Sequence, residues 1–151
     1  MTQEEFEELI GDESKRVDEN IQWREDEDHS PALEFRVRVD SQAGYPLDVK
    51  GSFNLHAKTL SYVLIHTGVG RIYALDLGKS HRNPDGTQLG EKHKHCWNQD
   101  LRDKEAYVPD DITAPVSDPV TVWKQFCAEA KITHAGRMVP PRMERQGELF
   151  S

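Results

Sequence analysis

Three of the seven histidines in this chain lie within one short stretch that also carries cations. From His81 to Trp97 the sequence reads HRNPDGTQLGEKHKHCW. Imidazole exchanges a proton near neutral pH because its unperturbed pKa is about 6.5, and its neutral form is a common metal ligand. The stretch therefore predicts a site for proton transfer or for a metal ion.

Local signals in this stretch predict how the histidines are placed. The dipeptides NP and DG at positions 83–86 predict a tight turn, with His81 and Arg82 at its entrance. From position 91 onward the residues fit a strand, so alternation places His93 and His95 on one face. Their Cβ atoms would then lie about 6.5 to 7 Å apart, close enough to hold one metal ion or to flank one scissile bond.

The first hypothesis is phosphodiester cleavage that needs no metal or other cofactor. Such a reaction requires a base, an acid and a cation for the developing charge, and RNA is the expected partner. An N-terminal helix before an antiparallel sheet also looks like the architecture of small bacterial endoribonuclease toxins, an analogy at the level of the fold. This hypothesis assigns catalysis to His81, Arg82, His93, Lys94, His95 and Tyr107, and substrate binding to Asn83, Lys92 and Lys104.

The second hypothesis is a metal enzyme that uses zinc or iron. A His-x-His pair on a strand presents two ligands, and a third could come from His81, Asp85 or Asp100. The stretch resembles the cupin pattern of a glycine, His-x-His and a later glutamate, although the glycine spacing is one residue too long and the glutamate is missing. This hypothesis takes His93, His95 and Asp85 as ligands. The stretch could also be a rigid turn beside a polar strand face, without a site.

A family resemblance involves the same residues. The segment LDLGKSHRNPDGTQLGEKHKHCW, after the strand SYVLIHTGVGRIYAL, is similar to a bacterial and phage-associated family of uncharacterised domains. In that family an HRNPDG turn is followed by an HxH strand, and the resemblance covers about residues 52–130. It implies no established activity, and its expected setting is phage defence or a toxin–antitoxin pair. The matching positions are His81, Arg82, Asn83, Pro84, Asp85, Gly86, His93 and His95.

Composition and charge limit the remaining possibilities. A length of 151 residues predicts one domain, and two cysteines are too few for a disulfide framework. With no long apolar run either, we expect a cytoplasmic protein without a membrane segment. Residues 1–28 hold twelve acids and three bases, a balance of −9, whereas the rest of the chain has a balance of +1, so the net charge of −8 comes from this segment. A non-catalytic alternative is therefore an inhibitor or antitoxin-like protein that binds a basic partner through residues 1–28.

The periodicity of the chain predicts an α+β fold. Thr2 and Glu5 form a capping-box signature for a first helix, which an acidic linker follows up to residue 28. Alternating segments at 33–39 and 47–55, two further strands at 60–66 and 71–77 joined around Gly68 and Gly70, the HKHCW segment and residues 105–108 predict an antiparallel meander of four to six strands. A helix from Pro119 to Ala130 should cover one sheet face, completing a core domain over residues 29–135.

The last residues predict a flexible tail over 136–151, because they are rich in proline and mixed charge and lack a period. The tail contains QGELF, which resembles the short peptides that bacterial replication proteins use to bind the sliding clamp. The residues that would contact the clamp are Gln146, Leu149 and Phe150.

Overall fold

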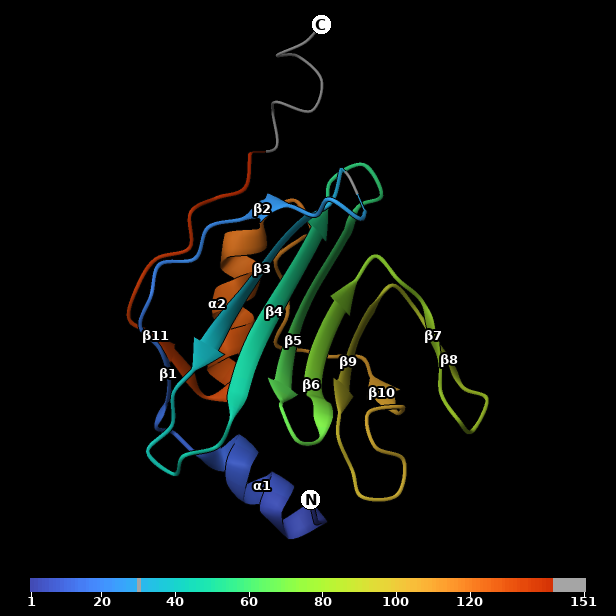
Figure 1. Cartoon of the computed structure of the whole chain (residues 1–151). Helices are drawn as coiled ribbons and strands as arrows, with labels where there is room; N and C mark the ends of the chain where they lie inside the picture. The colour runs from blue at the N-terminus through green and yellow to red at the C-terminus, as the bar shows by residue number, and fades with distance from the viewer. Residues whose placement is uncertain (30, 143–151) are drawn as a thin grey trace, which may run out of the picture.

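A seven-stranded antiparallel sheet dominates the computed structural model, which describes residues 1–29 and 31–142 (Figure 1). The strands lie in the order β10-β9-β6-β5-β4-β3-β2, so chain neighbours pair along the whole sheet, and a small hairpin, β7–β8, is inserted between β6 and β9. The α+β class and the antiparallel meander are thus confirmed, but the sheet has seven strands and not the expected four to six, because β2 forms within the segment expected to be a linker. The sheet strands are β2 (Arg24–Glu25), β3 (Leu33–Val39), β4 (Leu47–Asn54), β5 (Thr59–His66), β6 (Gly70–Leu77), β9 (Lys92–Cys96) and β10 (Ala106–Tyr107), and the hairpin strands are β7 (His81–Arg82) and β8 (Gln88–Leu89).

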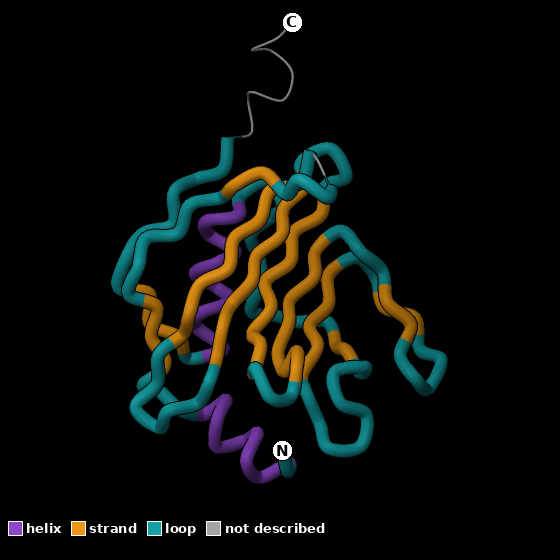
Figure 2. The backbone as a smooth tube through the Cα atoms, in the orientation of Figure 1, coloured by secondary structure: helices purple, strands orange, loops and turns teal. Residues whose placement is uncertain are grey.

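Both expected helices are present. Helix α1 (Gln3–Gly11) begins with the predicted capping box, in which Thr2 and Glu5 exchange hydrogen bonds between side chain and backbone. Helix α2 (Pro119–Ala130) begins after Asp118, whose side chain accepts a hydrogen bond from the backbone N–H of Thr121. Figure 2 shows α2 lying along one face of the sheet. This leaves the opposite face for the side chains that alternate away from α2.

The interface between α2 and the sheet is an aromatic core. The ring of Tyr62 on β5 lies 5.2 Å from that of Trp123 and 5.7 Å from that of Phe126 on α2, measured between centroids. The Tyr62 hydroxyl donates to the backbone carbonyl of Pro119 at 2.6 Å, so its buried polar atom is satisfied. Such large buried rings dominate the energy of the core, and they fix α2 and the sheet in register.

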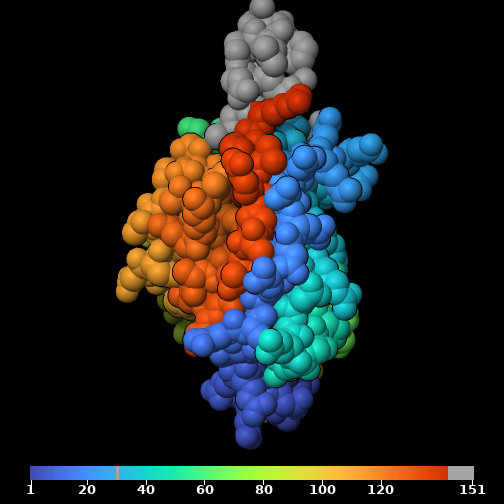
Figure 3. Space-filling view, turned by 90° about the vertical axis from the view of Figure 1, so that its left-hand side faces the viewer, coloured from blue at the N-terminus to red at the C-terminus, as the bar shows by residue number. Residues whose placement is uncertain are grey.

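The acidic N-terminal segment is part of the domain, which corrects the expected linker up to residue 28. Strand β1 (Lys15–Val17) pairs in parallel with β11 (Ile132–His134), and Val17 and Ile21 are buried in the core. The ammonium of the buried Lys15 donates to backbone carbonyls at the end of α1, among them that of Leu9 at 2.7 Å. Figure 3 shows the N-terminal and C-terminal segments side by side along one side of the molecule.

The C-terminal segment also packs further than expected. The backbone N–H of Ile21 donates to the carbonyl of Arg137, and that of Val139 donates to Ile21, each at 2.8 Å. Met138 is buried, so residues 136–139 belong to the folded domain and a tail cannot begin at position 136. The sliding-clamp residues Gln146, Leu149 and Phe150 lie outside the described residues. In the described part of the chain, neither helix has the length and apolarity needed to cross a membrane.

Candidate metal centre

The site begins with the pairing of β6 and β9. Asp76 lies opposite His93 and Ala74 lies opposite His95. Residues paired across antiparallel strands share a face, so these side chains all project from the face opposite α2. The rings of His93 and His95 have centroids 5.1 Å apart, which confirms that the two histidines share a sheet face.

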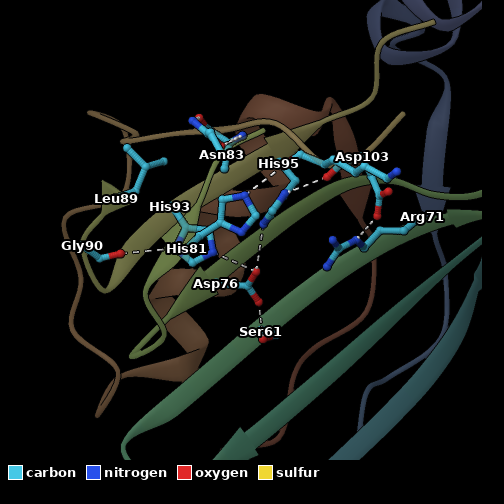
Figure 4. Close-up of polar contacts among 12 residues, drawn as sticks. Ser61, Arg71, Asp76, His81, Asn83, Leu89, Gly90, His93, His95 and Asp103 are labelled. Carbon is cyan, nitrogen blue, oxygen red and sulfur yellow. Dashed lines mark hydrogen bonds and ion pairs between the residues drawn. The ribbon is translucent and has the colours of Figure 1, made fainter. Parts of the chain in front are cut away.

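The β7–β8 hairpin brings the third histidine to this face. The ring centroid of His81 lies 4.5 Å from that of His95 and 5.4 Å from that of His93. One ring nitrogen from each histidine lies within 4.8 Å of the other two (Figure 4). The turn residue Asn83 anchors the hairpin, because its side-chain amide donates to the Ala106 carbonyl at 3.0 Å and accepts from the Ala106 N–H at 2.8 Å.

Backbone carbonyls hold the outer nitrogen of each histidine. Nδ1 of His95 lies 2.7 Å from the carbonyl oxygen of Asp103, and Nε2 of His81 lies 2.9 Å from that of Lys104. Nδ1 of His93 makes a longer contact of 3.4 Å with the carbonyl of Gly90. A carbonyl only accepts hydrogen bonds, so the short contacts of His95 and His81 favour the tautomers that carry a proton on these two nitrogens. In the neutral rings the other nitrogens, which point inward, therefore present lone pairs.

A buried carboxylate faces the same centre. Asp76 has one oxygen, Oδ1, that accepts a hydrogen bond from the Ser61 hydroxyl at 2.7 Å. Its other oxygen, Oδ2, lies 3.3 Å from Nε2 of His93 and 3.5 Å from Nε2 of His95. Charge-assisted hydrogen bonds are shorter, about 2.7 to 2.9 Å. Ligands placed tetrahedrally at the zinc bond lengths of about 2.0 to 2.1 Å would lie about 3.3 to 3.4 Å apart, which is close to both distances.

The protonation of His95 fits this arrangement. Burial lowers the pKa of His95, and the nearby Arg71 guanidinium lowers it further. The neutral imidazole, which is the form that binds metals, is therefore favoured at neutral pH. Its Nε2 lone pair faces the Asp76 carboxylate, so two acceptor atoms point at each other. A cation between them would remove that conflict.

A bulge in β6 brings Arg71 to the histidine face. Leu64 pairs with Tyr73 while the next residue, Ile65, pairs with Arg71, so Ile72 is the extra residue. A bulge changes which side chains lie on which face, and bulges are frequent next to active sites. Arg71 consequently lies beside the centre, where its guanidinium contacts the Asp103 carboxylate at 2.5 Å (Figure 4).

Two residues assigned to catalysis lie on the other face of the sheet. The buried ammonium of Lys94 contacts Asp111 at 2.6 Å and Glu129 at 2.9 Å, and the Tyr107 hydroxyl donates to the same Glu129 oxygen at 2.9 Å. Alternation along β9 requires this, because Lys94 stands between His93 and His95. The placement of Lys94 and Tyr107 at the histidine site was therefore wrong, and both anchor α2.

The other assigned residues are also accounted for by local structure. Lys92 donates to the carbonyl of Ile112 on the α2 side of the sheet, and Arg82 donates to the carbonyl of Gly86 within its own turn, each at 2.9 Å. The Asp85 side chain accepts from the Thr87 N–H, so Asp85 shapes the turn and does not join the three histidines as a ligand. Lys104 contributes its carbonyl to the site. Sequence reasoning missed Asp76, Ser61 and Arg71, although an aspartate between Leu75 and Leu77 in an apolar strand is a signal of a buried polar role.

Comparison with known proteins identifies a family whose function is unknown. The model of a family of unknown function, DUF6978, matches residues 1–132. This agrees with the expected relationship to an uncharacterised family, and the match includes the acidic segment that the resemblance over residues 52–130 left out. No curated protein and no solved structure matches the chain. The function must therefore be argued from the geometry.

Proposed function

Because this chain belongs to the family of unknown function DUF6978, we propose its activity from the site alone: a metal-dependent hydrolase with zinc as the first candidate ion. The observation that carries the proposal is the cluster of three histidines with a buried carboxylate beside it. Ring nitrogens of His81, His93 and His95 lie within 4.8 Å of one another, and Oδ2 of Asp76 lies 3.3 and 3.5 Å from Nε2 of His93 and of His95. Backbone carbonyls and the Ser61 hydroxyl hold the outer atoms of these side chains. Such outer contacts are the usual support of metal ligands.

The sheet residues are the proposed ligands. His93, His95 and Asp76 come from two paired central strands, and the distances from Oδ2 of Asp76 to Nε2 of each histidine, 3.3 and 3.5 Å, are those of neighbouring ligands on one tetrahedral ion. Two histidines and a carboxylate with one open position form a ligand set of catalytic zinc, and the same set also occurs with non-haem iron. The described residues form one large sheet covered by a helix, whereas cupins have two facing sheets. The proposed metal site therefore does not depend on a cupin fold.

The proposed role of His81 is proton transfer. His81 comes from a separate hairpin and is more exposed than the two sheet histidines, so it lies on the solvent side of the centre. A bound zinc ion would supply a water of lowered pKa and would polarise a substrate oxygen. Nδ1 of His81, whose Nε2 is held by the Lys104 carbonyl, is placed to accept a proton from a water at the centre.

The test separates metal binding from catalysis. We expect His81→Ala to retain the metal but to hydrolyse a chromogenic phosphodiester about 10² to 10⁴ times more slowly, the usual contribution of a positioned base. His93→Ala should lose both the metal and the activity. His56→Ala, in the exposed turn between β4 and β5 and far from the centre along the chain, is the matched control and should behave as wild type. Full activity in His81→Ala, or full metal content in His93→Ala, would contradict the proposed roles.

A second candidate is the metal-independent cleavage of RNA. It is favoured by the close pair of imidazoles at His81 and His95 and by Arg71, which supplies on this face the cation that Lys94 does not. Cleavage of single-stranded RNA in the presence of a chelator, lost in His95→Ala, would support this candidate over the zinc enzyme. RNA that stays intact under chelation but is cut after zinc is added would reject it.

A further inference from the structure

The loop over residues 97–105 supports the centre already described. Backbone carbonyls of Asp103 and Lys104 hold His95 and His81. The same two residues also line a cavity of about 600 Å³, together with Arg71, Arg102 and Trp97. The cavity therefore shares its wall with the outer contacts of the histidine centre.

The wall of this cavity is cationic. Arg71, Arg102 and Lys104 contribute three positive charges against the single carboxylate of Asp103. The chain as a whole has a net charge of −8, so this excess runs against the general charge of the protein. A concave surface of one charge sign concentrates ligands of the opposite sign.

Arg102 is held in place by backbone and ring contacts. Asn98 and Arg102 exchange two backbone hydrogen bonds of 2.8 Å, which keep Arg102 at a φ of +58°, in the left-handed region that non-glycine residues rarely adopt. The guanidinium carbon lies 5.9 Å from the centre of the buried Trp97 ring, within reach of a cation–π contact. The backbone hydrogen bonds therefore fix where the Arg102 side chain starts, and its planar guanidinium is preorganised to bind an oxyanion.

Arg71 connects the cavity to the centre. Its guanidinium binds the Asp103 carboxylate at 2.5 Å, and the carbonyl of the same Asp103 holds Nδ1 of His95 at 2.7 Å. A guanidinium has five N–H donors, so Arg71 can bind a second anion while it keeps Asp103. Only Asp103 would therefore separate an anion in the cavity from His95, a proposed metal ligand.

We infer that this cavity binds a phosphate group of the substrate on which the histidine centre acts. The inference rests on the proposed hydrolase, and it names the substrate class: a phosphate ester with a second phosphate beside the bond that is cut. Two arginines and a lysine suit phosphate because guanidinium forms paired charge-assisted hydrogen bonds with its oxygens. The phosphate can belong to a nucleotide or to a nucleic-acid strand.

The experiment is a titration of the folded protein with inorganic phosphate, followed by amide chemical shifts in ¹H–¹⁵N spectra. We expect millimolar binding, with the largest shifts in residues 97–104. Arg102→Gln should weaken it about tenfold, the loss of one charge-assisted hydrogen bond. Arg36→Gln is the matched control, because Arg36 lies on the histidine face of β3 in an ion pair with Asp48, and it should bind phosphate as wild type. No shift in this loop, or an equal loss in both variants, would overturn the inference.

Further arms identify the source of the phosphate and separate the two proposals. Competition by a mononucleotide and by a short single-stranded RNA shows which of them displaces phosphate from the cavity more effectively. The titration is repeated after chelation, so phosphate binding is measured independently of metal. Phosphate binding by a protein that contains no metal as purified, and that takes up none when zinc or ferrous iron is supplied, would support the cavity and reject the zinc hydrolase. Metal content without phosphate binding would reject the cavity alone.

Discussion

Replacing Asp76 by asparagine should change the stability of the metal-free and metal-bound protein in opposite directions. Without metal, Oδ2 of Asp76 faces Nε2 of His93 at 3.3 Å and that of His95 at 3.5 Å in a buried site. An asparagine of the same shape can place an N–H donor there, so the metal-free variant should unfold at a higher temperature than wild type. With metal, the variant lacks a charged ligand and should bind zinc more weakly.

The size of the second effect follows from binding linkage. At a zinc concentration about one hundred times the dissociation constant, wild type gains about 2.7 kcal/mol of unfolding free energy. If loss of the carboxylate weakens binding about a hundredfold, the variant gains only about 0.4 kcal/mol at that concentration. Thermal unfolding with a chelator and with added zinc measures both quantities. The control is Ser61→Ala, which removes the 2.7 Å hydrogen bond to Oδ1 but keeps the carboxylate, so it should still respond to zinc.

The result that refutes this reasoning is a loss of stability in Asp76→Asn that is the same with chelator and with zinc. In that case Asp76 would be stabilised by a protonated histidine, and the short contacts would be an ion-pair network without a metal. An unchanged zinc response in the variant would also exclude Asp76 as a ligand.

Three further predictions concern pH, a buried cation and the turn geometry. Burial and Arg71 lower the pKa of His95, so the unfolded chain binds more protons than the folded protein as pH falls below about 6.5. The free energy of unfolding of the metal-free protein should therefore fall with pH in this range. Denaturant titrations at several pH values should show a weaker pH dependence in His95→Gln. Lys15→Met should lower the free energy of unfolding by about 2 to 3 kcal/mol, because it leaves buried carbonyls at the end of α1 without their charged donor. Lys50→Met, at an exposed position, should lower it little. Equal melting temperatures of the two variants would contradict this. Gly86→Ala should lower the free energy of unfolding by about 1 to 2 kcal/mol because of its positive φ alone. Gly78→Ala should lower it clearly more, because the added Cβ would lie 2.1 Å from a backbone oxygen. A lower melting temperature for Gly86→Ala than for Gly78→Ala would reject this account.

The sequence predicted the elements whose signals are local. Alternation marked β3, β4 and β9, the turn at Gly68 and Gly70 marked β5 and β6, and capping residues marked both helices, because these patterns depend on one buried face and on nearby backbone groups. Strand β2 and the pair β1–β11 were missed. They are two or three residues long and lie in charged segments, so pairing with distant strands decides their structure.

For the site, too, the sequence predicted the residues whose placement depends on local signals. Alternation was sufficient to place His93 and His95 on one face, and the turn signals placed His81 at the start of a hairpin. Asp76 and Arg71 depended on tertiary structure, since the first requires the register between β6 and β9 and the second requires a bulge opposite Leu64. Alternation along β9 also predicts that Lys94 lies on the opposite face from His93 and His95, so its assignment to catalysis rested on nearness in the sequence and went against the strand pattern.

The acidic segment illustrates how a charge pattern can mislead. The net charge of the chain comes from residues 1–28, which suggested a linker or a binding arm, yet Val17 and Ile21 within this segment are core residues. Deleting this segment would therefore unfold the domain and could not test the antitoxin-like alternative. Substituting the exposed glutamates of α1, Glu4, Glu7 and Glu8, by glutamine is the appropriate test of a basic partner.

The metal content of the purified protein tests the central claim most directly. Elemental analysis should find about one equivalent of zinc per chain in wild type and in His56→Ala, as a single site with His93, His95 and Asp76 as ligands requires. His93→Ala, His95→Ala and Asp76→Ala should contain far less, while circular dichroism shows that they remain folded. Wild-type protein that contains no transition metal, and that takes up none when zinc or anaerobic ferrous iron is supplied, would contradict the account.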